Sequence, residues 1–432
     1  MTATRKTTRA TEALRAPYRV VEGGGVASAR GFSAAGIHAG FKKEAESLDL
    51  ALVLADAACP TAAVFTKSVF CAAPVLVSRE HLGTASFGHA RAILMNSGNA
   101  NASTGQPGIE YVRESTRKAA EAIGCEPREV LMASTGVIGV FMPPGPLEEH
   151  IAPLLGCASH AGGHAAARAI MTTDTHPKEC AVSYVSADPA YEGREFTVGG
   201  MAKGSGMIMP DMATMLAALT TDAPLDPALA YWALKAAADT SFNKVTVDSD
   251  TSTNDSCFLM ASGQAAPAAD GFAPFAEGSP AYCELAGALE AVCISLARQI
   301  AADGEGAPRL VTVNLRGAAD EADADRAARA IANSPLVKTA VFGHDANWGR
   351  IAMAVGKSGA RFRQEDVVID LMGLPVCQGG LSVAFDEKEA LRRFEAPEVV
   401  IDVDLGAGPA ATTVWTCDLT HGYVTINGDY RT

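Results

Sequence analysis

Residues 199–216 read GGMAKGSGMIMPDMATML and combine three features in a short space. A Gly/Ser loop holds Lys203, a Pro-Asp turn follows, and Ala213 and Thr214 open an apolar run, which predicts a buried strand over 215–219. One interpretation is an ordinary loop entering a core strand, with Thr214 as a β-former. The other is a self-cleaving precursor, in which the Thr214 hydroxyl attacks the Ala213 carbonyl. Water would then release an N-terminal threonine, whose α-amine, with a pKa of about 7.7–8.0, could serve as its own base.

Helical and strand patterns alternate on both sides of this stretch. Short apolar runs ended by turn residues predict strands over 48–56, 91–95, 130–133, 245–247 and 310–315, a hairpin of 180–185 with 195–198, and a strand-rich tail from 399. Apolar spacing and capping residues predict helices over 111–123, 146–155, 165–171, 227–238, 281–302 and 323–332. This mixture indicates a layered α/β fold with two or more sheets. Residues 265–280, rich in Ala, Pro and Gly, are expected to form a surface excursion.

Length and composition narrow the function classes. The chain has 432 residues, of which 48% are hydrophobic and 19% charged, so we expect a large core in more than one domain. A net charge of -14 argues against a nucleic-acid partner. Continuous apolar runs such as 50–54 are far shorter than the roughly 20 residues that span a membrane. The first 20 residues are basic and lack a hydrophobic core, so we expect a cytoplasmic protein, with a mitochondrial transit peptide as the alternative.

Motifs for metals and nucleotides are incomplete. None of the ten cysteines forms a C-x-x-C pair and no H-E-x-x-H occurs, so we expect buried thiols and no metal. Gly356-Lys-Ser resembles the end of a phosphate-binding loop, but Ile351 stands where that motif needs glycine. The run 248–252 starts like a calcium loop, yet Thr253 and Leu259 replace its glycine and glutamate. A loop of polar turns is the simpler interpretation, and such a loop could also line a site.

Several longer blocks resemble the ornithine acetyltransferase family, also called glutamate N-acetyltransferase, of arginine biosynthesis. The resemblance runs from about Gly31 to the last residue and rests on the blocks AAPV (72–75), NSGNAN (96–101), STGVIG (134–139), MTTDT (171–175), 203–216, DTSTNDS (250–256), GEGA (304–307), SPLVKT (334–339), NWGR (347–350) and INGDYRT (426–432). It implies the layered α/β fold shared with the DmpA aminopeptidase type. It also implies cleavage between Ala213 and Thr214 into a light chain (31–213) and a heavy chain (214–432), after a flexible segment (1–30).

The resemblance also implies roles for individual residues. Thr214 is the nucleophile, and Thr135 and Gly136 form the oxyanion hole, where preorganised donors stabilise charge on a carbonyl oxygen. Contacts to the substrate are implied for Thr172, Lys203, Thr214, Glu305, Asn427 and Thr432. Lys203 would face a carboxylate, Glu305 the charged amine end of the substrate, and the last two residues would complete the site.

The implied reaction is ping-pong transfer of an acetyl group from N2-acetyl-L-ornithine to L-glutamate through acetyl-Thr214, without cofactor or metal. The resemblance leaves open whether acetyl-CoA is a second donor, and it implies light–heavy pairs that assemble as dimers or larger. Met209, Asp211, His344, Ala346 and the strand end at 65–68 depart from the family pattern, which bears on substrate preference and pathway. Three alternatives stay open: an N-terminal-nucleophile amidohydrolase or aminopeptidase, a secondary-metabolism acetyltransferase of the same fold, and an uncleaved binding protein.

Overall fold

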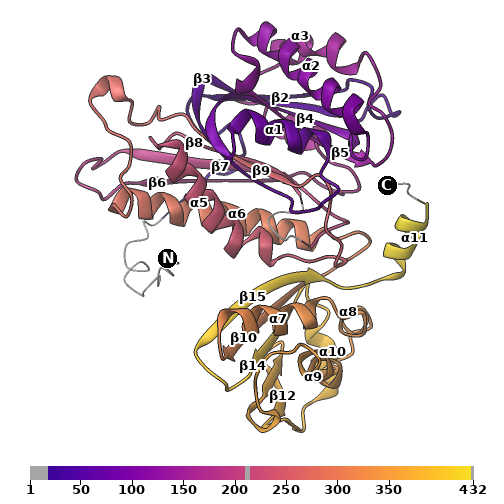
Figure 1. The fold of residues 1–432 in the computed structure, drawn as a ribbon. Coiled ribbons are helices and arrows are strands. Elements are labelled where there is room, and N and C mark those ends of the chain that lie inside the picture. The colour runs from indigo at the N-terminus through magenta and orange to yellow at the C-terminus, as the bar shows by residue number, and fades with distance from the viewer. Residues whose placement is uncertain (1–17, 210–214, 430–432) are drawn as a thin grey trace.

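The structure, a computed structural model, describes residues 18–209 and 215–429. Two sheets stand one above the other in Figure 1. The first has the strand order β1-β6-β7-β8-β9-β3-β4-β5, with β2 paired to β3. Its strands are β1 (Arg19–Val20), β2 (Phe32–Ile37), β3 (Leu50–Phe65), β4 (Phe87–Asn99), β5 (Val130–Val137), β6 (Lys178–Val185), β7 (Glu195–Lys203), β8 (Leu216–Thr221) and β9 (Ser256–Ala261).

Helices cover both faces of this first sheet (Figure 1). Neighbouring residues of a strand point to opposite faces, and accordingly Leu259 of β9 belongs to the core under α5 and α6, while Phe258 belongs to the core under α4. The helices of this part are α1 (Ala73–Leu82), α2 (Gly105–Ile123), α3 (Pro146–Gly156), α4 (Gly163–Ala169), α5 (Pro227–Thr240) and α6 (Pro280–Ala302). The layered α/β fold expected from the sequence is confirmed.

The centre of the sheet is built from both sides of the predicted cleavage point. Strands β8 and β9 run parallel to each other, with Leu216 opposite Ser256. They lie between β7, which precedes residue 213, and β3, and both outer pairings are antiparallel. The two predicted chains therefore contribute to one continuous sheet.

The second sheet has the strand order β13-β12-β11-β14-β10-β15. Its strands are β10 (Leu310–Ala318), β11 (Val368–Leu371), β12 (Leu374–Gln378), β13 (Leu381–Ser382), β14 (Glu398–Asp404) and β15 (Ala410–Cys417). Its helices are α7 (Glu321–Ala332), α8 (Pro335–Phe342), α9 (Trp348–Gly356) and α10 (Glu387–Arg393). Because Gly356 ends α9, Gly356-Lys-Ser cannot open a helix around a phosphate, and the rejection of that motif is confirmed. After β15 the chain returns to the first sheet as α11 (His421–Asp429) (Figure 1).

Several local predictions are wrong. Residues 245–247 are not a strand: a 3-10 turn (Phe242–Lys244) leads to a single bridge between Val245 and Trp415. The tail from 399 does contain the predicted strands, β14 and β15, but it ends in helix α11. Residues 19–30 are not a flexible segment, because β1 pairs with β6 and Val26 is fully buried. The 265–280 stretch is only partly a surface excursion, since the ring of Phe275 packs edge-on against Phe196 in the core.

Helix α6 is the one helix in 18–209 and 215–429 that is long and apolar enough to cross a membrane, judged by length and composition. The sequence shows no continuous apolar run of this length over the helix, because polar residues lie between the apolar ones. Leu285, Leu289 and Leu296 of that face are buried against the first sheet and α5. Packing in the core of the first sheet therefore accounts for its apolar composition.

Candidate active site

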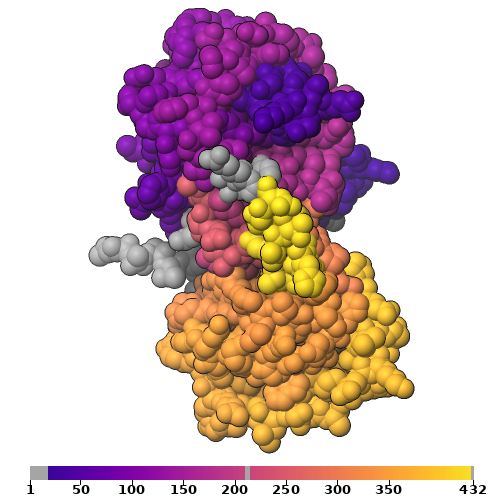
Figure 2. All heavy atoms as spheres, turned by 90° about the vertical axis from the view of Figure 1, so that its right-hand side faces the viewer, coloured from indigo at the N-terminus to yellow at the C-terminus, as the bar shows by residue number. Residues whose placement is uncertain are grey.

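A cavity of about 220 Å³ lies where the ends of β5, β7 and β8 meet the 248–255 loop and α11. Six of the residues implied as site residues line it: Thr135, Gly136, Thr172, Lys203, Glu305 and Asn427. Ala213, Thr214 and Thr432 lie outside the described residues. Met215, bonded covalently to Thr214, lines the same cavity. Figure 2 shows α11 lying across this face, at the junction between the two sheets.

The pair Thr135 and Gly136 sits at the end of β5, where it pairs with a bulge in β4. Gly136 has φ of +129°, and a Cβ there would lie 2.4 Å from the carbonyl carbon of Gly98, so no other residue fits without displacing the backbone. The Asn254 side chain donates hydrogen bonds of 2.6 and 2.8 Å to the Ala100 and Ser134 carbonyls and fixes this strand end. Thr135, with its hydroxyl, and Gly136, with its backbone N–H, thus both line the cavity.

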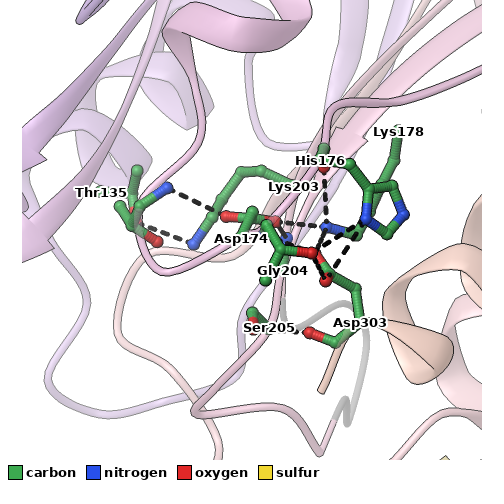
Figure 3. Close-up of polar contacts among 10 residues, drawn as sticks. Thr135, Asp174, His176, Lys178, Lys203, Gly204, Ser205 and Asp303 are labelled. Atoms are coloured by element: carbon green, nitrogen blue, oxygen red, sulfur yellow. Dashed lines mark hydrogen bonds and ion pairs between the residues drawn. The ribbon is translucent and has the colours of Figure 1, made fainter. Parts of the chain in front are cut away.

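Lys203, the last residue of β7, brings a cation to the same place. Its side chain is buried, and Nζ donates to Thr135 Oγ1 at 3.5 Å, which leaves the Thr135 hydroxyl proton free to be donated elsewhere. Burial lowers the pKa of Lys203, and the nearby Asp174 carboxylate opposes that change. Figure 3 shows Lys203 extending toward Thr135, with Asp174 beside it.

Glu305 and α11 form another part of the cavity wall. Asn427 Nδ2 donates to Glu305 Oε2 at 2.6 Å, and the Glu305 side chain is itself mostly buried. A Cβ at Gly206 would lie 2.4 Å from the Glu305 carboxylate oxygens, so this glycine allows the carboxylate to approach the Lys203–Gly206 loop closely. The cavity lining thus includes both a cation, Lys203, and a carboxylate, Glu305. This arrangement matches a ligand that carries both a carboxylate and an amine.

Sequence reasoning missed three polar side chains that line the cavity, those of Asp248, Asp255 and Tyr423. Asp248 accepts hydrogen bonds from the main-chain N–H groups of Met207 (2.6 Å) and Ile208 (2.9 Å) and from the Tyr423 hydroxyl (3.4 Å). Asp255 is buried, its Oδ2 has no hydrogen-bond partner among the described residues, and burial raises the pKa of its carboxyl well above the usual range. The dense polar run from 248 was the available signal, and its alternative role, lining a site, is the one the structure shows.

No group of three or more His, Cys, Asp or Glu side chains that could hold a metal ion occurs within 18–209 and 215–429. All ten cysteines are free thiols, and five of them are buried. The polar side chains that line the cavity offer hydroxyl, amide, ammonium and carboxylate groups.

Comparison with known proteins places this chain in a family. The model of the ArgJ family matches residues 33–432. The arginine biosynthesis bifunctional protein ArgJ of Symbiobacterium thermophilum is 47% identical over 95% of this chain and 99% of its own length. The protein of the same name from Dehalococcoides mccartyi is 45% identical over 97% and 100%. A solved structure of ornithine acetyltransferase from Mycobacterium tuberculosis, complexed with ornithine, is 38% identical over 46% of this chain and 100% of that one, with a TM-score of 0.41. The chain belongs to the ArgJ family.

Proposed function

We propose that this enzyme of arginine biosynthesis transfers the acetyl group of N2-acetyl-L-ornithine to L-glutamate through an acetyl ester on Thr214. One observation carries the proposal. The donor pair Thr135 and Gly136, the buried Lys203 and the carboxylate of Glu305 all face one cavity, and Met215, the neighbour of Thr214 in the chain, lines it too. Family membership supports the same reaction class, since its relatives are named for arginine biosynthesis.

The first step of the proposed mechanism matures the protein. The Thr214 hydroxyl attacks the Ala213 carbonyl, the peptide becomes an ester, and water hydrolyses that ester. Two chains result, 1–213 and 214–432, and the second begins with a free α-amine. An amine of this kind has a pKa of about 7.7–8.0 and can accept a proton near neutral pH.

Acetyl transfer then proceeds in two halves. The α-amine takes the hydroxyl proton as Thr214 Oγ bonds to the acetyl carbon, and Thr135 and Gly136 donate to the oxyanion. The C–N bond breaks, and the α-ammonium returns the proton to the departing ornithine nitrogen. Glutamate then enters, its amine attacks the ester carbonyl, and the Thr214 α-amine takes the proton from the attacking nitrogen. The bond between the acetyl carbon and Thr214 Oγ breaks, and the α-ammonium returns the proton to Oγ. N-acetylglutamate leaves and the free hydroxyl is restored.

The decisive experiment measures transfer with purified wild-type protein. N-acetylornithine and glutamate are varied together, and parallel double-reciprocal lines are the result expected of an acyl-enzyme intermediate. Acetyl-CoA replaces N-acetylornithine in a second series, because the relatives are called bifunctional. Acetate release that is unaffected by glutamate would instead identify a hydrolase, the alternative function. A panel of other amine acceptors distinguishes glutamate transfer from a related secondary-metabolism reaction.

Replacing Lys203 tests the carboxylate contact. Lys203→Met keeps most of the aliphatic stem and removes the charge, so we expect KM for N-acetylornithine to rise about 10- to 150-fold, the value of one charge-assisted hydrogen bond. For the analogue of N-acetylornithine in which the carboxylate is an amide, the same substitution should raise KM far less. Lys235→Met, which removes a half-buried lysine paired with Asp239 on α5 and outside the cavity lining, is the matched control and should behave as wild type.

Thermal melts and fragment yields of the Lys203 variant are measured beside its kinetics. Normal KM values in a poorly folded or poorly cleaved protein would assign Lys203 to the loop structure instead. Cleaved, stable protein with a raised KM for the acid supports the carboxylate contact.

A further inference from the structure

A buried group of four charged residues lies directly behind the cavity and includes Lys203. Lys178 Nζ donates to Asp174 Oδ1 and to Asp303 Oδ2, both at 2.6 Å. The side chains of Lys178 and Asp174 are fully buried, and that of Asp303 is 4% exposed. Two lysines and two aspartates balance in charge. Figure 3 shows Asp174 between Lys203 on one side and Lys178 with Asp303 on the other.

Asp174 joins the two segments that line this side of the cavity. Its Oδ2 accepts the main-chain N–H of Thr172 at 2.9 Å, and its Oδ1 accepts that of Gly204 at 2.7 Å. Thr172 and Lys203, the residue before Gly204, both line the cavity. One carboxylate therefore sets the distance between two implied substrate contacts that are far apart in the sequence.

Lys178 and Asp303 hold Asp174 in turn. Asp303 accepts from the Thr175 main-chain N–H at 3.0 Å, its own carbonyl accepts from Ser205 Oγ at 2.6 Å, and the exposed His176 lies 3.4 Å from its carboxylate. Such a buried ionic group contributes little net stability, because desolvation offsets the attraction between the charges. Its effect on the position and charge of Lys203 is the more direct explanation for its presence.

Five charged groups act on the Lys203 ammonium. The carboxylates of Asp174, Asp255 and Glu305 favour its charged form, while Lys178 and Lys42 oppose it. Burial alone would raise the pKa of Asp174, but Lys203 and Lys178 outweigh burial and lower it, so Asp174 carries its full charge. Asp255 contributes less, because burial raises the pKa of its carboxyl.

We propose that Asp174 is the positioning residue of this site, holding Lys203 as a cation at a fixed distance from Thr172, with Lys178 and Asp303 fixing Asp174. The inference deepens the proposed function and rests on it, because the carboxylate of N-acetylornithine is the ligand that Lys203 would bind.

The test compares two substitutions of opposite electrostatic sign in the same buried group. Asp174→Asn removes a negative charge and should lower the pKa of Lys203, whereas Lys178→Met removes a positive charge and should raise it. KM for N-acetylornithine is followed against pH. It should rise as pH passes the Lys203 pKa, because a neutral amine loses the charge-assisted hydrogen bond to the carboxylate.

We expect the alkaline rise in KM to move to lower pH in Asp174→Asn and to higher pH in Lys178→Met. At neutral pH, KM of Asp174→Asn should be about 10- to 100-fold above wild type. The double variant, which restores charge balance, should bring the rise back toward its wild-type position. The same series with the substrate amide corrects for titration of the substrate amine, and its KM should not follow Lys203.

Shifts of the same sign in both single variants, or shifts shared by the amide, would show a purely structural role and overturn the inference. If Asp174→Asn does not fold, Lys178→Met alone decides by the direction of its shift. Inactive wild-type protein would remove the proposed function itself, whereas active wild-type protein with unshifted variants would remove only the role of Asp174.

Discussion

The Thr214→Ala protein is expected to purify as one intact chain of 432 residues and to transfer no acetyl group. Alanine lacks the hydroxyl that would attack the Ala213 carbonyl, so neither the ester nor the new α-amine can form. Loss of a nucleophile costs roughly 10⁶-fold in kcat in a well-studied hydrolase. Mass spectrometry of the purified protein and the N-acetylornithine assay measure the two effects separately.

Thr214→Ser is the matched control, because it keeps a hydroxyl and the same backbone. It should still be cleaved before residue 214 and keep measurable transfer. Wild-type protein that stays full length, or a Thr214→Ala protein cleaved at the same peptide bond, would contradict the proposed maturation.

The second large effect is expected at the oxyanion hole. Thr135→Ala removes the side-chain donor and should lower kcat about 100- to 1000-fold, or about 2.7–4 kcal/mol. KM should change little, because the donor acts on charge that develops mainly in the transition state. Steady-state kinetics with N-acetylornithine measure both constants.

Thr135→Ser restores the hydroxyl without the methyl group and should recover most of kcat. It also controls for the 3.5 Å contact from Lys203 Nζ, which either hydroxyl can accept. A Thr135→Ala variant with raised KM and unchanged kcat would assign this residue to ground-state binding.

The sequence patterns predicted most of the first sheet, because its strands are apolar runs bounded by turn residues. They missed the strands β1, β2 and β9 and the helix α1. The six buried residues of β9 directly follow the polar run 248–255, and α1 begins at an Ala-Pro turn signal. The predicted strand at 245–247 has the right composition. Its backbone nevertheless bonds outside any ladder, with Thr246 N–H donating to Trp415 O and Val247 N–H to Ile208 O. Local apolarity predicts burial, but the partner of a backbone group depends on distant parts of the chain.

The candidate site, too, contains residues that the sequence predicted and residues that it did not. Thr135, Gly136, Thr172, Lys203, Glu305 and Asn427 came from resemblance to a family, and spacing alone favoured an ordinary loop around Lys203. Asp174 and Lys178 have i, i+4 spacing, yet the second carboxylate that Lys178 contacts, Asp303, is 125 residues away. Asp255 likewise gains its importance from the cavity and from Lys203. No local pattern encodes contacts between residues so far apart in the sequence, so the three-dimensional fold must be known before such residues can be recognised.

The position of β8 and β9 between β7 and β3 has a consequence for the matured protein. Cleavage before residue 214 would leave two polypeptides woven into one sheet, with hydrogen-bond ladders along both borders of the inserted pair. Such chains cannot separate while they stay folded, as ordinary subunits do, because separation would break both ladders and expose the core that the two chains build together. The cut protein should therefore melt in a single cooperative transition in which unfolding and chain separation coincide, its melting temperature should rise with protein concentration, and its isolated halves should not reassemble simply on mixing.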